Sequence, residues 1–122
     1  MARAEVYAGI CGFKTLVTAT SDDRRHVRLK VESQCPDVLR LRKRLEALTL
    51  DAYAEVGPCD RPGGVKRSLV MELCQELPHL ACAVPSGLFK ALEVAAGLAL
   101  PRDASIRVFR EEEGDAAEPE KG

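Results

Sequence analysis

The strongest constraint on the fold is an alternation of apolar residues on both sides of a short polar turn. The turn is Ser21-Asp22-Asp23-Arg24-Arg25, with Val17 and Ala19 before it and Val27 and Leu29 after it. Successive side chains of a strand point to opposite faces of a sheet, so alternating apolar residues form one buried face. The pattern therefore predicts a β-hairpin. Centring it on the middle residue of the turn pairs Val17 with Leu29 and Ala19 with Val27.

Continued outward, this pairing places Cys11 opposite Cys35 on the same face of the hairpin. Directly opposed residues have Cβ atoms roughly 4.5–5.5 Å apart. Two thiols at that distance can share a metal, form a disulfide or simply pack in the core. Cys11 also lies where the apolar alternation changes phase, between Gly9 and Gly12, which predicts a β-bulge or a sharp bend.

Cys35 stands where the second strand ends and a helix begins. Pro36 suits the first helical position, and Asp37 complements the positive end of a helix. A helix N-terminus favours the thiolate form of a cysteine, which binds metals or attacks electrophiles. Apolar residues then recur at helical spacing, at Val38, Leu41, Leu45 and Leu48.

The rest of the chain predicts further helices and one more strand. Helices are expected over about 65–77 and from Pro85 or Ser86 to about Gly97, and a last strand over Ser105–Phe109. Residues 49–56 fit either a helix end or a brief strand. The order ββαααβ predicts an α+β, two-layer domain over residues 1–110, with a small, mostly antiparallel sheet and helices on one face.

Charge is distributed unevenly along the chain. Residues 111–122 hold six of the 19 acidic residues and one of the 18 basic residues, so the remaining chain carries a formal charge of +4. An acidic segment without large apolar residues predicts a disordered tail over 111–122. The basic run at Arg40, Arg42, Lys43 and Arg44 is typical of a solvated helix face. The absence of interleaved aromatics argues against a nucleic-acid partner.

The start of the chain has no charged-then-apolar leader, and no apolar run is long enough to cross a membrane. These features predict a cytoplasmic protein without a membrane partner. In a reducing cytosol, cysteines serve more often as metal ligands, catalytic thiols or small buried hydrophobes than as structural disulfides.

Four of the five cysteines lie at predicted element ends. Cys74 is near the end of a helix on its buried side, and Cys82 comes just before the next helix, so they join Cys11 and Cys35. Element ends converge at the edges of a two-layer fold, where four thiolates could enclose a zinc ion or hold an iron–sulfur cluster. The spacing C-x23-C-x38-C-x7-C matches no standard zinc ribbon or ferredoxin pattern. Cys59, in the loop over 57–64, is expected to be incidental.

The sequence leaves three functions open. The first is a metal-binding protein with a structural, sensory or electron-carrying role, in which an iron–sulfur cluster is slightly favoured over zinc. The second is a metal-free binding or assembly module with buried cysteines, and the third is a thiol redox switch or enzyme that uses Cys35. His79 could replace one cysteine ligand or support it, although a lone His in a connection is usually solvated. No catalytic residue is predicted, because the chain has no C-x-x-C, phosphate loop or carboxylate pair. A protein partner is compatible with each function.

Two parts of the chain contain the four cysteines Cys11, Cys35, Cys74 and Cys82. They are Ala8–Phe13 with Gln34-Cys35-Pro36, and Cys74–Ser86 with Lys90–Pro101. Together they resemble a family of small, uncharacterised cysteine-bearing proteins of anaerobic bacteria and archaea. The resemblance covers most of residues 5–108 and implies a four-cysteine set with a metal or iron–sulfur site, but no activity. An anaerobic setting would suit an oxygen-sensitive cluster. That family has Cys-Pro where this chain has Cys82-Ala83, and Cys59 is extra.

Overall fold

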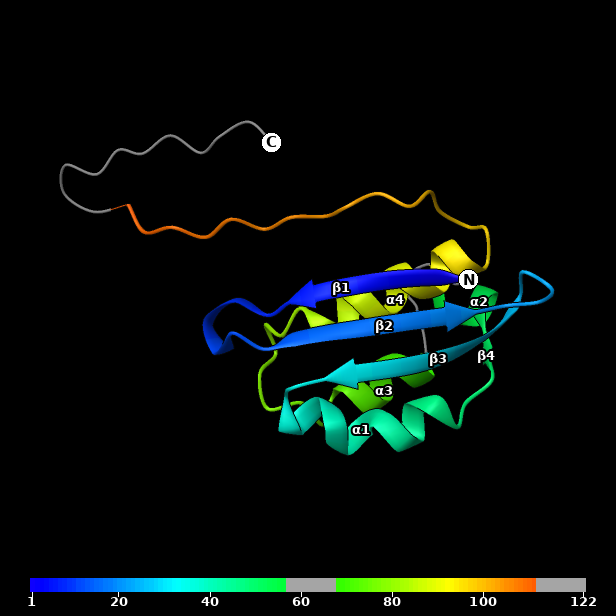
Figure 1. The fold of residues 1–122 in the computed structure, drawn as a ribbon, viewed down its shortest axis with the longest axis horizontal. Helices are drawn as coiled ribbons and strands as arrows, with labels where there is room; N and C mark the ends of the chain where they lie inside the picture. The colour runs from blue at the N-terminus through cyan, green and yellow to red at the C-terminus, as the bar shows by residue number, and fades with distance from the viewer. Residues whose placement is uncertain (57–67, 112–122) are drawn as a thin grey trace, which may run out of the picture.

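Residues 1–56 and 68–111 are described by a computed structural model (Figure 1). They form an antiparallel sheet of four strands in the order β1-β2-β3-β4, packed against helices α1 and α4. The predicted α+β class is therefore confirmed. The elements are β1 Ala2–Tyr7, the 3₁₀ turn η1 Gly9–Cys11, β2 Lys14–Thr20, β3 His26–Ser33, α1 Pro36–Glu46, β4 Leu50–Asp51, α2 Ala52–Val56, α3 Leu69–Cys74 and α4 Val84–Ala95.

The central hairpin forms with a register two residues away from the predicted one. Val17 pairs with Val31 and Ala19 pairs with Leu29, so the hairpin is centred on Arg24. Because side chains alternate with period two, a shift of two residues leaves the same residues on the buried face. The predicted buried face is therefore correct, although the predicted partners are wrong.

The polar turn accounts for this register. One carboxylate oxygen of Asp23 accepts hydrogen bonds from the backbone N–H groups of Arg25 and His26, at 2.9 and 2.8 Å. Arg24 has a φ of 60°, in the left-handed region that few non-glycine residues adopt. These hydrogen bonds from Asp23 centre the turn on the following residue, Arg24, and not on Asp23 as the predicted pairing assumed.

The sequence pattern predicts one strand region over Glu5–Thr20, but the structure has two strands joined by a tight connection. β1 and β2 pair antiparallel, and η1 reverses the chain between them. Gly9 and Gly12 have φ values of 81° and 72°, which explains the glycines at both ends of the turn. The sharp bend is confirmed. Cys11 consequently leaves the sheet, and its predicted position opposite Cys35 is wrong.

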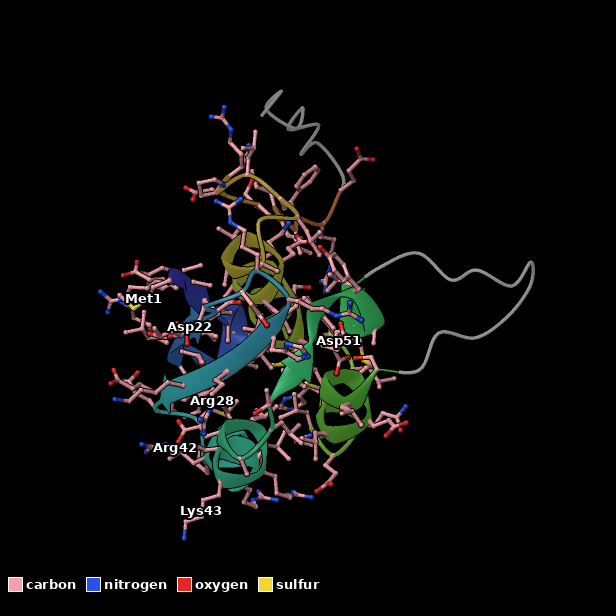
Figure 2. The ribbon with its side chains drawn as sticks, turned by 90° about the vertical axis from the view of Figure 1, so that its right-hand side faces the viewer. Met1, Asp22, Arg28, Arg42, Lys43 and Asp51 are labelled. Carbon is pink, nitrogen blue, oxygen red and sulfur yellow. The ribbon has the colours of Figure 1, made fainter. Side chains whose placement is uncertain are left out.

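The core lies between the sheet and its helices. α4 packs on β1 and β2, whereas α1 packs on β3. A Cβ built on Gly87 of α4 would lie 2.2 Å from Cγ2 of Val6, so glycine allows the close approach of α4 to β1. The opposite face of the sheet is polar, and Figure 2 shows Arg28 on it. The fully buried side chains include Val17, Val27, Val31, Leu45, Leu88 and Leu92.

The helix boundaries follow the predictions closely. α1 begins at Pro36 with Cys35 as its N-cap, as predicted. α4 covers Val84–Ala95, and α3 covers the middle of the predicted helix 65–77, of which 65–67 lie outside the described residues. Residues 49–56 contain both predicted alternatives, the short strand β4 and the helix α2.

Besides the division of the first strand and the added helix α2, the predicted order ββαααβ needs two further corrections. β4 lies between α1 and α2, and the predicted last strand, Ser105–Phe109, is not formed: residues 101–111 have no regular secondary structure and are exposed. The predicted acidic tail lies, apart from Glu111, outside the described residues. Among the helices of residues 1–56 and 68–111, none has the length and apolar character needed to cross a bilayer.

Candidate thiol site

The four described cysteines all lie where elements end or begin. Cys11 closes η1, Cys35 joins β3 to α1, Cys74 ends α3, and Cys82 lies in the connection to α4. Figure 1 shows the β1–β2, β3–α1 and α3–α4 connections together at the left, opposite the β2–β3 turn. We call this end of the sheet, formed by residues 8–13, 34–35 and 74–83, the thiol end.

The cysteines differ in their exposure to solvent. Cys74 is only 6% exposed and belongs to the hydrophobic core, and Cys35 and Cys82 are partly buried against the same core. Cys11 is exposed, because its turn projects beyond the sheet. Three thiols therefore line the thiol end of the core, while the fourth lies in solvent.

Cys74 and Cys82 interact across the connection between α3 and α4. Burial, with a smaller contribution from the nearby Cys82, raises the pKa of the Cys74 thiol to about 11. Cys74 is thus a neutral thiol at pH 7. The connection turns back through hydrogen bonds from the backbone N–H of Leu77 to the carbonyl of Cys74 and from Cys82 to His79.

The backbone of Cys35 is hydrogen-bonded on both sides, whereas its thiol does not cap the helix. Its N–H donates to the hydroxyl oxygen of Ser33 at 3.0 Å, and Ser33 shares a 2.7 Å hydrogen bond with Thr15. The Cys35 carbonyl accepts the first helical hydrogen bond from Leu39, but its side chain makes no capping hydrogen bond. The predicted N-cap geometry therefore leaves the sulfur of Cys35 free to contact a ligand.

The four described cysteines lie at the same end of the sheet but are scattered over its connections and do not form one ligating group. All four are free thiols. In residues 1–56 and 68–111, no three His, Cys, Asp or Glu side chains are grouped closely enough to hold a metal ion. His79 is exposed in the same connection, and Cys59 lies outside the described residues.

Two exposed aliphatic residues at the thiol end were missed by the sequence reasoning. Ile10 in η1 and Leu80 beside His79 are both fully exposed. Both belong to short turns, where no periodic pattern signals burial or exposure. Gly9 and Pro78 were the sequence features that could have indicated this exposure. They mark connections, and connecting segments run over the surface of a protein.

The basic run on α1 is paired with acids. Arg42 lies 3.3 Å from Glu46, and Arg40 pairs with Asp37. Figure 2 shows Arg42 and Lys43 on α1 pointing away from the body of the protein. Arg44 makes a two-pronged pair with Glu76, at 2.6 and 2.7 Å, which ties α1 to the segment just after α3.

Comparison with known proteins gives a family but no function. The model of a family of unknown function (DUF6951) matches residues 2–108, which include the thiol end and extend beyond α4. No curated protein and no solved structure matches the chain.

Proposed function

We propose that this chain, which belongs to the family of unknown function DUF6951, is a small metal-binding protein with a four-cysteine site. The ligands are the thiolates of Cys11, Cys35, Cys74 and Cys82. The observation that carries the proposal is the position of these cysteines on three connections at one end of the sheet (Figure 1). Four thiolates are a suitable ligand set for tetrahedral zinc or an iron–sulfur cluster.

Loading the site requires the exposed turn to move toward the buried cysteines. No heavy atom lies within 4 Å of a Cβ built on Gly9 or Gly12, so the turn that carries Cys11 is surrounded by open space. Glycines also adapt their φ and ψ angles more readily than other residues. The turn over Gly9–Cys11 is therefore the part of the site that closes.

The surroundings of the other three ligands favour an iron–sulfur cluster over zinc. Cys35, Cys74 and Cys82 pack against the hydrophobic core, and limited solvent exposure is one of the factors that set the potential of a cluster. A bound metal would also displace the proton of Cys74, because only thiolates ligate metals. The proposed role is structural, sensory or electron-carrying.

Metal analysis of protein purified without oxygen tests this proposal. We expect one metal centre per chain, with visible absorption if the centre is an iron–sulfur cluster. Changing Cys11, Cys35, Cys74 or Cys82 to Ser should reduce the metal content, whereas Cys59→Ser should not. A wild-type protein that takes up neither zinc nor an iron–sulfur cluster would overturn the proposal, as would equal metal loss in the Cys59→Ser control.

The full exposure of Ile10 and Leu80 supports a second function, a metal-free module that binds a protein partner through the thiol end. Exposed aliphatic residues mark a binding surface where they form one contiguous apolar patch, and this function requires Ile10 and Leu80 to do so. In that case, serine in place of each of the four cysteines would cost a little stability and leave partner binding intact. Leu80→Asn would weaken partner binding without changing metal content.

A further inference from the structure

The segment Ser105–Phe109 has the sequence of a strand, but it forms no strand in the part of the chain that the structure describes. Ile106 and Val108 alternate with polar residues, yet they are 83% and 89% exposed. Figure 1 shows the chain after α4 running clear of the sheet. Leaving aliphatic side chains of a β-type pattern in water is unfavourable, so the segment is suited to pairing with an open strand edge.

β1 offers such an edge. It lies at one side of the sheet and pairs only with β2 among the described strands, so the backbone groups on its outer side have no ladder partner. Its six residues, Ala2–Tyr7, are long enough to pair with the five residues of Ser105–Phe109. An exposed edge of this kind is a template for an added strand.

The helix side of this edge is also incompletely covered. Ala4 of β1 is only partly buried, although it packs against the core. On α4, Gly87 contacts Val6, and Val94 lies seven residues later on the same side of the helix, also partly buried. A strand added at the outer edge of β1 would cover Ala4 and Val94.

We propose that Ser105–Phe109 of one chain pairs with the outer edge of β1 in a second copy, and that the second copy reciprocates. Residues two apart in a strand share a face, so Ile106 and Val108 both lie on the helix side, against Ala4 and Val94. The result is a dimer with two-fold symmetry in which each sheet gains a strand.

A second copy is the occupant that fits these observations best. In the single chain the segment stays exposed and does not use its own β1 edge, even though α4 packs along β1 just before it. In a pair of copies, the segment of each chain binds the β1 edge of the other. The interface is therefore self-complementary and forms a closed dimer instead of a chain of subunits. The family match reaches residue 108, so most of the segment belongs to the domain that the family shares.

Light scattering on full-length protein in reducing, metal-free buffer tests the dimer. We expect wild-type protein to be dimeric and the double variant Ile106→Asn, Val108→Asn to dissociate, with a dissociation constant raised about 100-fold or more. Arg107→Pro, which introduces a residue that strands exclude, should also dissociate it. Leu80→Asn, an equally exposed aliphatic at the thiol end, is the matched control and should remain dimeric.

Hydrogen exchange then identifies the paired strands. In the dimer, the amides of Ser105–Phe109 and those on the outer edge of β1 should be protected together, and the double variant should lose both. A wild-type monomer overturns the proposal, and so does a dimer that the double variant leaves intact. A monomer with protected amides in Ser105–Phe109 would also overturn it, because the segment would then pair with its own chain. None of these variants touches a helix or strand of the described fold, so circular dichroism should change only by the loss of the added strand.

Discussion

The two ends of the sheet differ in what holds them. At the end that carries the β2–β3 turn, side chains form hydrogen bonds with the backbone and ion pairs with one another. Arg25 pairs with Asp51 at 3.1 Å, stacks over the ring of Tyr53 at 5.3 Å, and accepts a hydrogen bond from the N–H of Ala52 on its carbonyl. Figure 2 looks at this end and shows Asp51 where β4 meets α2. The hydrogen bonds and ion pair join the hairpin to the helical layer.

The thiol end is built differently. The described hydrogen bonds within the turns of Cys11 and Cys82 join backbone atoms, such as Gly12 to Gly9 and Cys82 to His79. Each turn also carries a fully exposed aliphatic residue. Side-chain bonds therefore order the turn at the hairpin end, whereas at the thiol end they hold Cys35 and Glu76 but leave the turns of Cys11 and Cys82 to backbone bonds. These two turns are the parts that can rearrange around a ligand. This contrast predicts where substitutions will cost stability and where they will change function.

The largest expected effect comes from Gly87, where the thiol end is anchored to the core. A Cβ at this position would lie 2.2 Å from Cγ2 of Val6, a fully enclosed contact between α4 and β1. Gly87→Val should lower the free energy of unfolding by roughly 3 kcal/mol or more, because overpacking forces the helix away from the strand. Urea denaturation measures the loss.

The matched control for Gly87 removes the atom that causes the clash. Val6→Ala eliminates Cγ2, so the double variant Val6→Ala, Gly87→Val should be more stable than Gly87→Val alone. If the effects of the two substitutions on the free energy of unfolding were additive, the contact between Val6 and position 87 would not cause the loss of stability. The core near the thiol end would then be able to adjust to a larger side chain, as its turns can.

The next effect is the pH dependence contributed by Cys74. Its pKa is raised from 9.0 to about 11 by burial and by Cys82, so folding disfavours the thiolate. The unfolded chain ionises at the lower pH. The neutral thiol therefore contributes its full share to the free energy of unfolding below pH 9. This contribution, roughly 2–3 kcal/mol, is lost as the pH rises toward 11. Urea denaturation of metal-free protein across this range measures it.

Two variants separate Cys74 from the other groups that titrate in alkali. Cys74→Ala should flatten the fall in stability between pH 9 and pH 11, even if it lowers stability at pH 7. Cys11→Ser changes an exposed thiol and should leave the slope of wild-type protein unchanged. Equal slopes in all three proteins would show that Cys74 ionises as readily folded as unfolded.

The faces of the hairpin could be predicted from sequence, but its register could not. Alternation with period two identifies which residues are buried, and Val17, Val27 and Leu29 are buried as expected. A shift of two residues preserves that alternation, so the apolar pattern cannot distinguish the two registers. The choice depends on the hydrogen bonds that Asp23 makes in the turn, which no periodic signal records.

The thiol site shows a similar limit. Proline and an acidic residue after Cys35 identify the N-cap, and the helical stripe identifies Cys74 as buried. The distances between cysteines depend on how loops fold at the end of the sheet. Cys11 illustrates this, because its glycines were consistent with a bulge inside a strand or with the tight turn that the structure has. The last strand was mispredicted for another reason: Ser105–Phe109 has strand propensity, but it does not pair with the open edge of β1 inside one chain.

A smaller effect is expected at the start of α3, the helix that ends at Cys74. The hydroxyl of Ser68 accepts a hydrogen bond from the N–H of Met71 at 3.1 Å, which caps the helix. Ser68→Ala should cost about 1 kcal/mol, measured by urea denaturation, while Ser68→Thr should retain most of the stability. A carboxylate oxygen of Glu55 accepts from the N–H of Leu69 at 3.0 Å in either variant, so the helix should still form. Equal losses for Ala and Thr would argue that packing, not capping, is what Ser68 contributes.

The smallest effect on stability is expected at Asp23, although this residue decides the register. Its hydrogen bonds to His26 and Arg25 hold the pKa of the carboxyl well below its usual range. The stability it adds is therefore present above its unfolded pKa of about 4 and is lost as the pH falls through its lower folded value. Asp23→Ala should flatten this acid dependence in thermal unfolding experiments. The overall change should be small, because solvent screens an exposed carboxylate.

The same variant tests whether the turn or the core selects the register. The alternative register, with Val17 opposite Leu29, buries the same face, so the core alone does not exclude it. Without the side chain of Asp23, cross-strand NMR contacts should report a mixture of the two pairings. Contacts between Val17 and Val31 alone would mean that β4 and α2 fix the register through Arg25 and Asp51. The pairing of β2 with β3 would then be determined by contacts with β4 and α2 and not by the hydrogen bonds of the turn.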